Sequence, residues 1–395
     1  MPAVTVRPPA AASSRTTTLK SRARSSSANI SCPAIVRDAN GRPTGRVGEN
    51  GFRGLVGRLP DPSPEELEAS TVLMIKDMNR FGLTTFGSAG CEQDVLPLYK
   101  KWAEEHRSNI RVFCISGVGA GTTPEQVTKA LPQIGQLKLF QGDNQLDHVT
   151  FGESVYGPLH DPMFIPKSNP QPQQLEQWRR IATEVAKAGL PLHVHANLTD
   201  TISAFLDQIE AINKEYPVRN LRWVLAHANQ LNASHLARMR ELGVYAAVHP
   251  WGVINGGINQ RVFGEDALDM APLDTIQKSG VTWGFGSDGS RANQIMPFVQ
   301  LGWAVTGKMV GGKRALRQPI SREDALIAFT RKNALFVFQE SNLGSIQVGK
   351  LADLIVTDHD YLTVPADRIK DIKPVLTMVG GRVVYDAAAP ETSSR

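Results

Sequence analysis

The stretch LRWVLAHANQLNASHLARMRELGVYAAVHP, residues 221–250, holds a strand, a helix and a second strand in immediate succession. Residues 221–230 and 243–250 are continuous apolar runs that end in polar groups, as strands buried on both faces do. Between them, Asn232 is suited to cap a helix, and the run to Leu242 is typical of a surface helix. Two strands joined by a crossover helix predict neighbouring parallel strands.

The same unit recurs along the chain. Pro64 and the acidic residues after it begin a helix that Gly82 ends, and a buried strand follows. Repeats of this kind form either a doubly wound sheet or a (β/α)8 barrel. No GxGxxG motif opens a predicted helix, so we expect an α/β fold of the (β/α)8 (TIM) barrel type with strand one missing. The predicted strands are 83–90, 110–118, 135–143, 189–198, 221–230, 243–250 and 280–290.

Composition excludes several classes of protein. The 395 residues are 41% hydrophobic, and no apolar run approaches the roughly 18 residues that span a bilayer. Residues 1–31 carry five basic and no acidic residues, which accounts for the net charge of +5. The remainder therefore has no basic excess for nucleic acid, and we expect neither a nucleic-acid nor a membrane partner.

The N-terminal segment and the cysteines bear on the compartment. Residues 1–34 are rich in Ser and Arg without the apolar core of a secretory signal, so we expect a disordered basic tail. A mitochondrial presequence is the alternative to a cytoplasmic protein. Cys32, Cys91 and Cys114 form neither a CxxC pair nor an even framework. We expect a reducing compartment, with Cys91 and Cys114 as small apolar core residues.

Side chains able to do chemistry stand at the predicted strand ends, where barrels of this type place their active sites. Each alone has a structural explanation, because a histidine in a strand is often a paired core residue and an aspartate in a turn often caps it. Together, two neutral imidazoles and an anionic oxygen match a first-row metal site with a position left open for water. The residues are Lys138, His193, His195, His227, His249 and Asp288.

The order Lys, His, His, Asp along the strands resembles the amidohydrolase superfamily. The C-terminal stretches SREDALIAFTRKNALFVF (321–338) and GKLADLIV (349–356) are similar to its closing helix and small β-sandwich, and RDANGRPTGRV (37–47) looks most like its family-3 branch. The resemblance implies a carboxylated Lys138 on strand four, His195 on strand five and His227 on strand six as metal ligands. It implies Asp288 on strand eight as the proton acceptor.

One part of the family pattern is missing. The family carries a His-x-His pair on strand one, whereas no histidine precedes His106 here. The pair at 193–195 does not replace it, because only three strand–helix units fit between His195 and Asp288. The resemblance therefore implies one divalent metal, zinc, with the other metal site lost. His193 is then structural, and His249 and Trp251 either face a small-molecule substrate or only pack.

These observations predict three regions: a tail (1–34), an amidohydrolase-like barrel (35–340), and a C-terminal β-sandwich segment and tail (341–395). The resemblance implies a metal-dependent hydrolase of amide or other non-peptide C–N bonds. The alternatives are a catalytically inactive remnant, and an isomerase or decarboxylase of the same superfamily. Residues 30–60, or a partner chain in a homo-oligomer, would fill the place of the missing strand.

Overall fold

The computed structural model describes residues 35–47, 60–88, 91, 95–117, 121–289 and 293–389. The chain divides into two compact units, Met1–Ser63 and Pro64–Arg395. In the first unit, β1 (Ile35–Arg37) and β2 (Pro43–Val47) pair as an antiparallel hairpin. The predicted tail lies outside the described residues, and the domain boundary at residue 340 stays a prediction.

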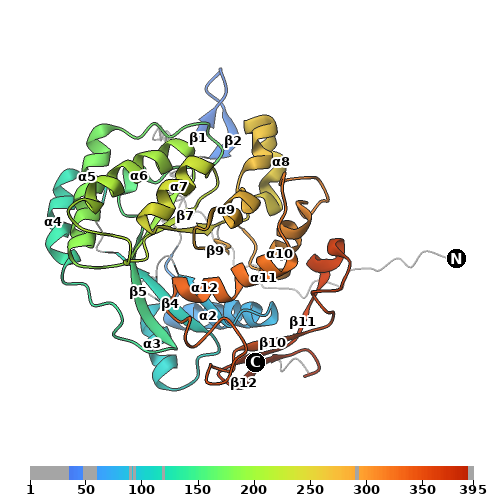
Figure 1. The fold of residues 1–395 in the computed structure, drawn as a ribbon. Coiled ribbons are helices and arrows are strands. Elements are labelled where there is room, and N and C mark those ends of the chain that lie inside the picture. Colours follow the sequence, from blue (N-terminus) through green and yellow to red (C-terminus); the bar gives the residue numbers. More distant parts are fainter. Residues whose placement is uncertain are drawn as a thin grey trace, which may run out of the picture. The chain divides into compact units, whose positions relative to one another are not determined.

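The second unit is built on a curled sheet of seven parallel strands in the order β3-β4-β5-β6-β7-β8-β9 (Figure 1). Every strand pairs with the next one in the chain, which is the topology of a (β/α)8 barrel. Within the described residues no strand joins β9 to β3, so the predicted incomplete barrel is confirmed. The strands are β3 (Thr85–Ser88), β4 (Arg111–Ser116), β5 (Leu146–Glu153), β6 (Leu192–Ala196), β7 (Val224–His227), β8 (Tyr245–Val248) and β9 (Trp283–Phe285).

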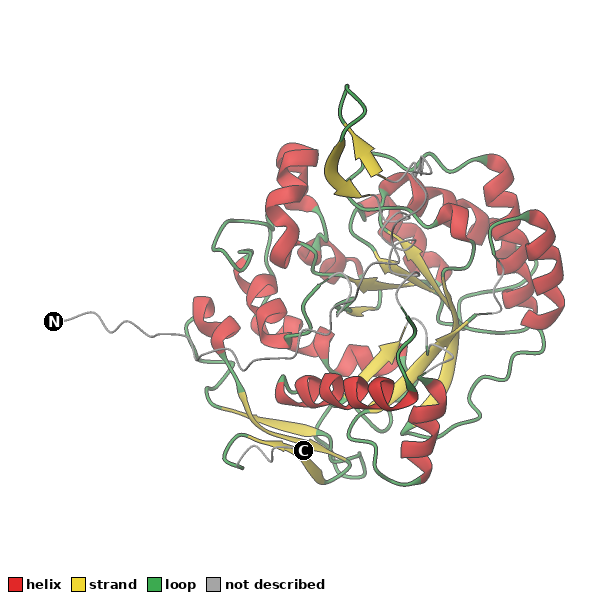
Figure 2. Cartoon of the chain, turned by 180° about the vertical axis from the view of Figure 1, so that it is seen from behind, coloured by secondary structure: helices red, strands yellow, loops and turns green. Residues whose placement is uncertain are grey.

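Helices between the strands cover the outer face of the sheet (Figure 2). The main core forms there, where residues such as Leu225 and Val248 pack against the helices. Among the described residues, no helix is both long and apolar enough to cross a membrane. The helices are α2 (Pro64–Arg80), α3 (Leu96–Glu104), α4 (Pro124–Ile134), α5 (Pro172–Lys187), α6 (Thr199–Asn213), α7 (Ala233–Leu242), α8 (Gly252–Phe263), α9 (Leu273–Ser279) and α10 (Pro297–Thr306), with 3-10 turns η1 (Gly157–Leu159) and η2 (Gly264–Asp269).

The inner face of the sheet is covered by the chain's own C-terminal part. After α11 (Arg322–Phe329), α12 (Arg331–Phe336) brings Phe336 against Tyr245, with ring centroids 5.9 Å apart. Alternate strand residues, which point away from the outer helices, meet this segment. It thus buries apolar surface that an open barrel would expose. The strand residues in these inner clusters are Phe113, Val149, Val224, Ala226 and Ala247.

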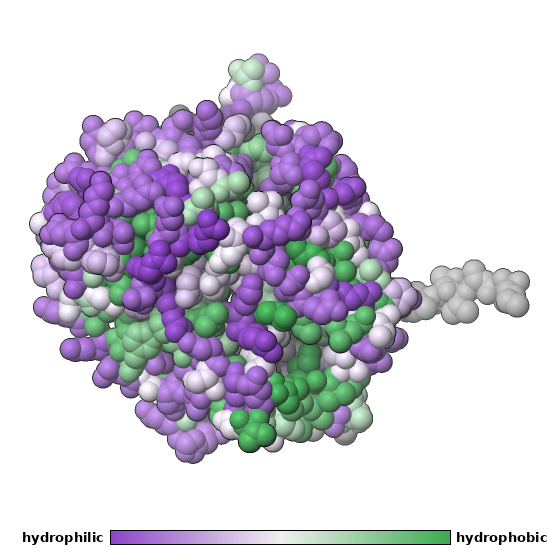
Figure 3. All heavy atoms as spheres, viewed as in Figure 1, coloured by the Kyte–Doolittle hydropathy of each residue, from purple (hydrophilic) through white to green (hydrophobic). Residues whose placement is uncertain are grey.

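A small antiparallel sheet at the C-terminus confirms the remnant of a sandwich. It contains β10 (Leu354–Thr357), β11 (Pro374–Val379) and β12 (Arg382–Asp386), and the turn η3 (Ala366–Asp371) precedes β11. One face packs on α2, where Thr377 Oγ1 donates to the Asn79 carbonyl at 2.7 Å. The other face leaves Val356 and Val383 exposed, and Figure 3 shows apolar side chains gathered where these strands lie.

A buried ion pair ties this small sheet to the barrel. Arg111, at the start of β4, donates from Nε and Nη2 to the two carboxylate oxygens of Asp353, both at 2.8 Å. The side chains are 3% and 6% exposed, so removal of either partner would leave an uncompensated buried charge.

The predicted strand at residues 135–143 is wrong. Residues 135–143 are a connection in which Phe140 has a φ of 58° and Asp143 accepts turn hydrogen bonds, and the strand is β5 instead. Asp147 and His148 interrupt the apolar pattern of β5, so the sequence does not identify this strand. Asp147 accepts from the backbone N–H of Gly142 at 3.0 Å, so its carboxylate ties the connection to the strand.

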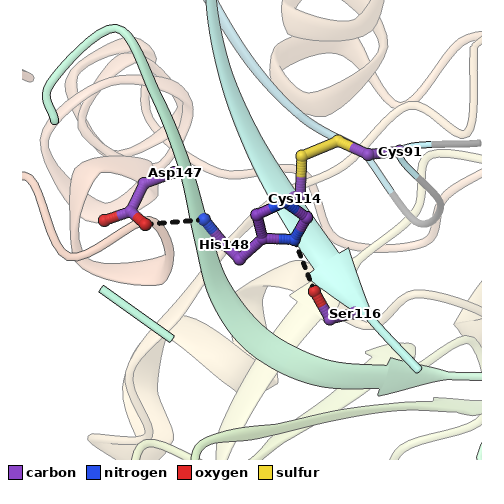
Figure 4. Close-up of a disulfide and its surroundings, with 5 residues drawn as sticks. All are labelled: Cys91, Cys114, Ser116, Asp147 and His148. Atoms are coloured by element: carbon purple, nitrogen blue, oxygen red, sulfur yellow. Dashed lines mark hydrogen bonds between the residues drawn. A yellow bond between two sulfur atoms is a disulfide. The ribbon is translucent and has the colours of Figure 1, made fainter. Parts of the chain in front are cut away.

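The cysteine prediction is right about packing, since Cys114 is buried in an apolar cluster against which Cys91 packs, and wrong about pairing. Cys91 and Cys114 form a disulfide, with Cα atoms 5.4 Å apart. Cys114 lies on β4 and Cys91 follows β3, so the bond links the connection after one strand to its neighbour. Figure 4 shows His148 beside this bond, with its Nδ1 2.6 Å from Ser116 Oγ.

Candidate metal centre

Three side chains from neighbouring strands converge at the C-terminal edge of the sheet. Glu153 ends β5, His195 lies on β6 and His227 ends β7. Glu153 Oε1 lies 2.7 Å from His227 Nε2 and 3.5 Å from His195 Nδ1. The three offer ligand atoms within 4.8 Å of one another, and both imidazoles are buried.

A second carboxylate fixes the orientation of His195. Asp161 is buried, and its oxygens accept the backbone N–H groups of Asn197 and Leu198 at 2.8 to 3.1 Å. His195 Nε2 lies 2.9 Å from Asp161 Oδ1 and donates to this residue. The other nitrogen, Nδ1, is buried without a hydrogen-bond partner and faces Glu153. A carboxylate that holds one imidazole nitrogen while the other stays free is typical of metal-binding histidines.

A second group of three shares His227. His227, His249 and Asp288 place ligand atoms within 4.8 Å of one another. His249 follows β8, and its Nδ1 is hydrogen-bonded to His227 Nδ1. His227 and Asp288 have φ values of 70° and 48°, a left-handed backbone rare for residues with side chains. In the strand register His227 is opposite Ala196, whose side chain lies in the outer core. A regular strand would therefore direct His227 outward as well, and its left-handed backbone directs the imidazole to the cluster instead.

The surroundings set the protonation of these groups. Burial lowers the pKa of His227 to about 4 and holds the pKa of His249 well below its ordinary value, so both imidazoles are neutral. Burial alone would also lower the pKa of His195, but the carboxylates of Asp161 and Glu153 raise it to about 9. Against the effect of burial, His195 and His227 hold the pKa of Glu153 well below its usual range.

The residues present fit a divalent metal. The buried Nδ1 of His195 lacks a partner, and the neutral His227 and anionic Glu153 stand beside it. Two imidazole nitrogens and one carboxylate oxygen are a frequent ligand set of zinc, which leaves a fourth position for water.

The structure places one predicted ligand outside the strands and brings two further residues to the cluster. Lys138 lies exposed in the connection before β5, so its assignment to strand four is wrong. Glu153 ends that strand instead. Asp161 was missed as well, because it lies in the irregular connection after η1 and nothing in its local sequence marks it. His227 belongs to both groups of three, with His195 in one and Asp288 in the other, and the metal-binding and catalytic roles of these residues stay predictions.

The remaining predicted residues border the cluster. The Trp251 ring lies 6.1 Å from that of His227 and 5.7 Å from that of His249, between centroids. Trp251 is buried, and its Nε1 has no hydrogen-bond partner. His193 is half-buried, and burial lowers its pKa.

Comparison with known sequences settles the family. A model of the amidohydrolase family matches residues 3–385. The chain belongs to the amidohydrolase family. A 5-methylthioadenosine/S-adenosylhomocysteine deaminase of Symbiobacterium thermophilum is 25% identical over 54% of this chain and 50% of that protein. An N-substituted formamide deformylase of Arthrobacter pascens is 22% identical over 89% of this chain and 67% of that protein. The chain thus matches about half the length of the first relative.

Solved structures agree on the fold of this amidohydrolase-family chain. An uncharacterized metal-dependent hydrolase from Pyrococcus furiosus superposes with a TM-score of 0.61 at 21% identity, over 81% of this chain and 66% of that chain. An adenosine deaminase from Xanthomonas campestris with bound zinc gives 0.56 at 16% identity, over 82% of this chain and 71% of that chain. At these identities the likeness concerns the fold alone.

Proposed function

We propose that this chain is a metal-dependent hydrolase that cleaves a non-peptide C–N bond of a small molecule. The observation that carries the proposal is the convergence of Glu153, His195 and His227 at the strand ends of an amidohydrolase fold. In this proposal they hold one divalent metal ion, zinc. When bound, such an ion polarises a carbonyl group and lowers the pKa of water toward 7.

The chain's own groups position and move protons. Asp161 accepts the Nε2 proton of His195, so Nδ1, which gives up its own proton when a metal binds, is the nitrogen that serves as a ligand. Asp288 is the proton acceptor in this proposal: its carboxylate takes a proton from the attacking water and returns it to the leaving nitrogen. His249, neutral and hydrogen-bonded to His227, lies within reach of Asp288 and orients it or the substrate.

Metal content tests the proposal. The purified chain, without added metal, should contain about one zinc per chain, and the double variant His195→Ala/His227→Ala should contain none. A folded wild-type chain without stoichiometric metal, even after incubation with zinc, would instead favour a catalytically inactive remnant.

The reaction class needs a second measurement. N-substituted formamides, the substrates named for one relative, are the first compounds to supply to the zinc-loaded chain. Hydrolysis in water labelled with oxygen-18 should transfer the label into the acid product, with Asp288→Asn inactive. A product formed without the label would point to an isomerase or a decarboxylase.

A further inference from the structure

The imidazole of His227 makes a contact with each of its two ring nitrogens. Its Nε2 lies 2.7 Å from Glu153 Oε1, and its Nδ1 is hydrogen-bonded to Nδ1 of His249. Burial holds the pKa of both imidazoles below the ordinary value, so each is neutral and carries one ring proton. Two protons therefore serve the two contacts, one between His227 and the carboxylate and one between the two rings.

The carboxylate of Glu153 fixes where these protons stand in the metal-free chain. Glu153 is ionised, and an ionised carboxylate can only accept. His227 Nε2 therefore carries the proton of the bond to Glu153, and His227 Nδ1 is bare. His249 Nδ1 must then be the donor between the two rings. In this arrangement a proton occupies the nitrogen of His227 that faces the candidate metal site.

A metal ion at Nε2 requires the opposite arrangement. A ligand nitrogen is bare, so the one proton of a neutral His227 then stands on Nδ1. His227 Nδ1 becomes the donor, His249 Nδ1 must accept, and the proton of His249 stands on its Nε2. An imidazole can take either part, because it has one donor and one acceptor nitrogen. Asp161, the partner of His195, is a carboxylate and only accepts.

His249 is held in one orientation toward His227. Its backbone N–H donates to the His227 carbonyl at 3.1 Å, and the two rings meet edge to face with centroids 4.0 Å apart. The ring of Trp251 packs against His249 from another side, with centroids 5.7 Å apart. An added Cβ at Gly286 would lie 2.8 Å from His249 Nε2, so a side chain at that position would displace the ring. These contacts keep His249 Nδ1 directed at His227.

We propose that His249 is a positioning residue that sets which nitrogen of His227 carries the proton. When a metal ion binds, the proton between the two rings passes from His249 Nδ1 to His227 Nδ1. The proton of His227 Nε2 leaves to solvent, and His249 Nε2 takes one up from solvent, so the pair keeps two protons and its charge. The transfer rests on the proposed metal site, whereas the metal-free arrangement rests on the contacts alone.

Nitrogen-15 NMR of the full chain with labelled histidine tests both states, because a protonated and a bare ring nitrogen give distinct signals. At neutral pH without metal, His227 should be protonated at Nε2 and His249 at Nδ1. After addition of zinc, His227 should be protonated at Nδ1 and His249 at Nε2. A metal-free His227 protonated at Nδ1, or a zinc-bound chain in which His249 keeps its Nδ1 proton, would overturn the inference.

Substitutions of His249 test the positioning role by competition for zinc against a chelator. His249→Leu should weaken zinc binding about 10- to 100-fold, as loss of an orienting partner does. His249→Gln should recover most of the affinity, because the amide oxygen accepts from His227 Nδ1–H. His235→Gln is the matched control, since His235 is buried on α7 and belongs to neither candidate metal group, and it should bind zinc as the wild type does. Circular dichroism should show all three variants folded.

The outcomes separate this inference from the hydrolase proposal. A folded His249→Leu variant with wild-type affinity, or a His249→Gln variant no better than His249→Leu, would overturn the positioning role alone. A second zinc ion held by His227, His249 and Asp288 would also overturn it, because His227 Nδ1 would then carry no proton. If zinc does not bind, the hydrolase proposal fails and the transfer fails with it, while the metal-free spectrum still decides which nitrogens carry protons.

Discussion

Replacement of Glu153 by glutamine tests the corrected ligand set most directly. Glutamine keeps the shape of the side chain and loses its charge. Glu153 Oε1 lies 2.7 Å from His227 Nε2 and 3.5 Å from His195 Nδ1. Among the described residues, the one candidate metal group that contains both histidines takes its carboxylate from Glu153. Loss of a residue that only orients a ligand weakens metal binding about 10- to 100-fold. Loss of the anionic ligand itself should weaken zinc binding by at least about 100-fold, or about 2.7 kcal/mol.

The assay is competition for zinc against a chromophoric chelator, with Lys138→Gln as the control. Lys138 is exposed in the connection before β5, so its variant should bind zinc as the wild type does. In metal-free Glu153→Gln, the pKa of His195 should fall from about 9 toward its ordinary 6.5, which NMR titration measures. Unchanged zinc affinity in folded Glu153→Gln, or lost affinity in Lys138→Gln, would refute the assignment of Glu153.

Three further predictions follow from individual contacts. Asp161→Asn should weaken zinc binding about 10- to 100-fold in the same chelator assay, because it releases His195; an unchanged affinity would show that this carboxylate does not orient the ligand. Burial lowers the pKa of His235 to about 4, so protonation favours the unfolded chain. The free energy of unfolding should therefore fall as the pH drops from about 6.5 toward 4, and His235 should contribute up to about 1.4 kcal/mol per pH unit to this fall. Denaturant titrations of His235→Gln over the same pH range should show a smaller fall. Reduction of the Cys91–Cys114 bond, which spans 23 residues, should lower the free energy of unfolding by about 3 kcal/mol, measured with and without dithiothreitol. A Cys91→Ser/Cys114→Ser variant should show no such dependence on the reductant.

Most of the fold could be predicted because parallel strands buried on both faces have a strong signature. Continuous apolar runs such as 221–230 and 243–250 became β7 and β8. The prediction failed where polar residues interrupt a strand. Within β5, Asp147 accepts from the backbone N–H of Gly142, and His148 is hydrogen-bonded to Ser116. No pattern in the local sequence predicts these hydrogen bonds.

The disulfide was missed for a similar reason. Cys91 and Cys114 are separated by a helix, and their proximity depends on the pairing of β3 with β4. Spacing along the chain carries no information about this distance. The filling of the inner face by α12 was missed because it depends on the path of the C-terminal segment across the sheet.

The error at Lys138 shows what a strand order can and cannot predict about a metal site. The family resemblance implied an anionic oxygen beside two histidines, supplied by a carboxylated Lys138, but Lys138 lies on a segment that is not a strand. In the structure Lys138 lies exposed in the connection before β5, whereas Glu153 ends β5 at the edge of the sheet and is anionic without modification. The structure therefore offers a group of the expected kind at a residue other than the one that was expected. His227, at the end of β7, and Asp288, after β9, could be placed at the edge of the sheet because these strands have a clear apolar pattern. Their left-handed backbones, which the sequence does not show, also belong to the geometry of the cluster. The order of the strands predicts which types of side chain meet at the edge of the sheet. The exact bounds of each strand determine which residue provides each side chain.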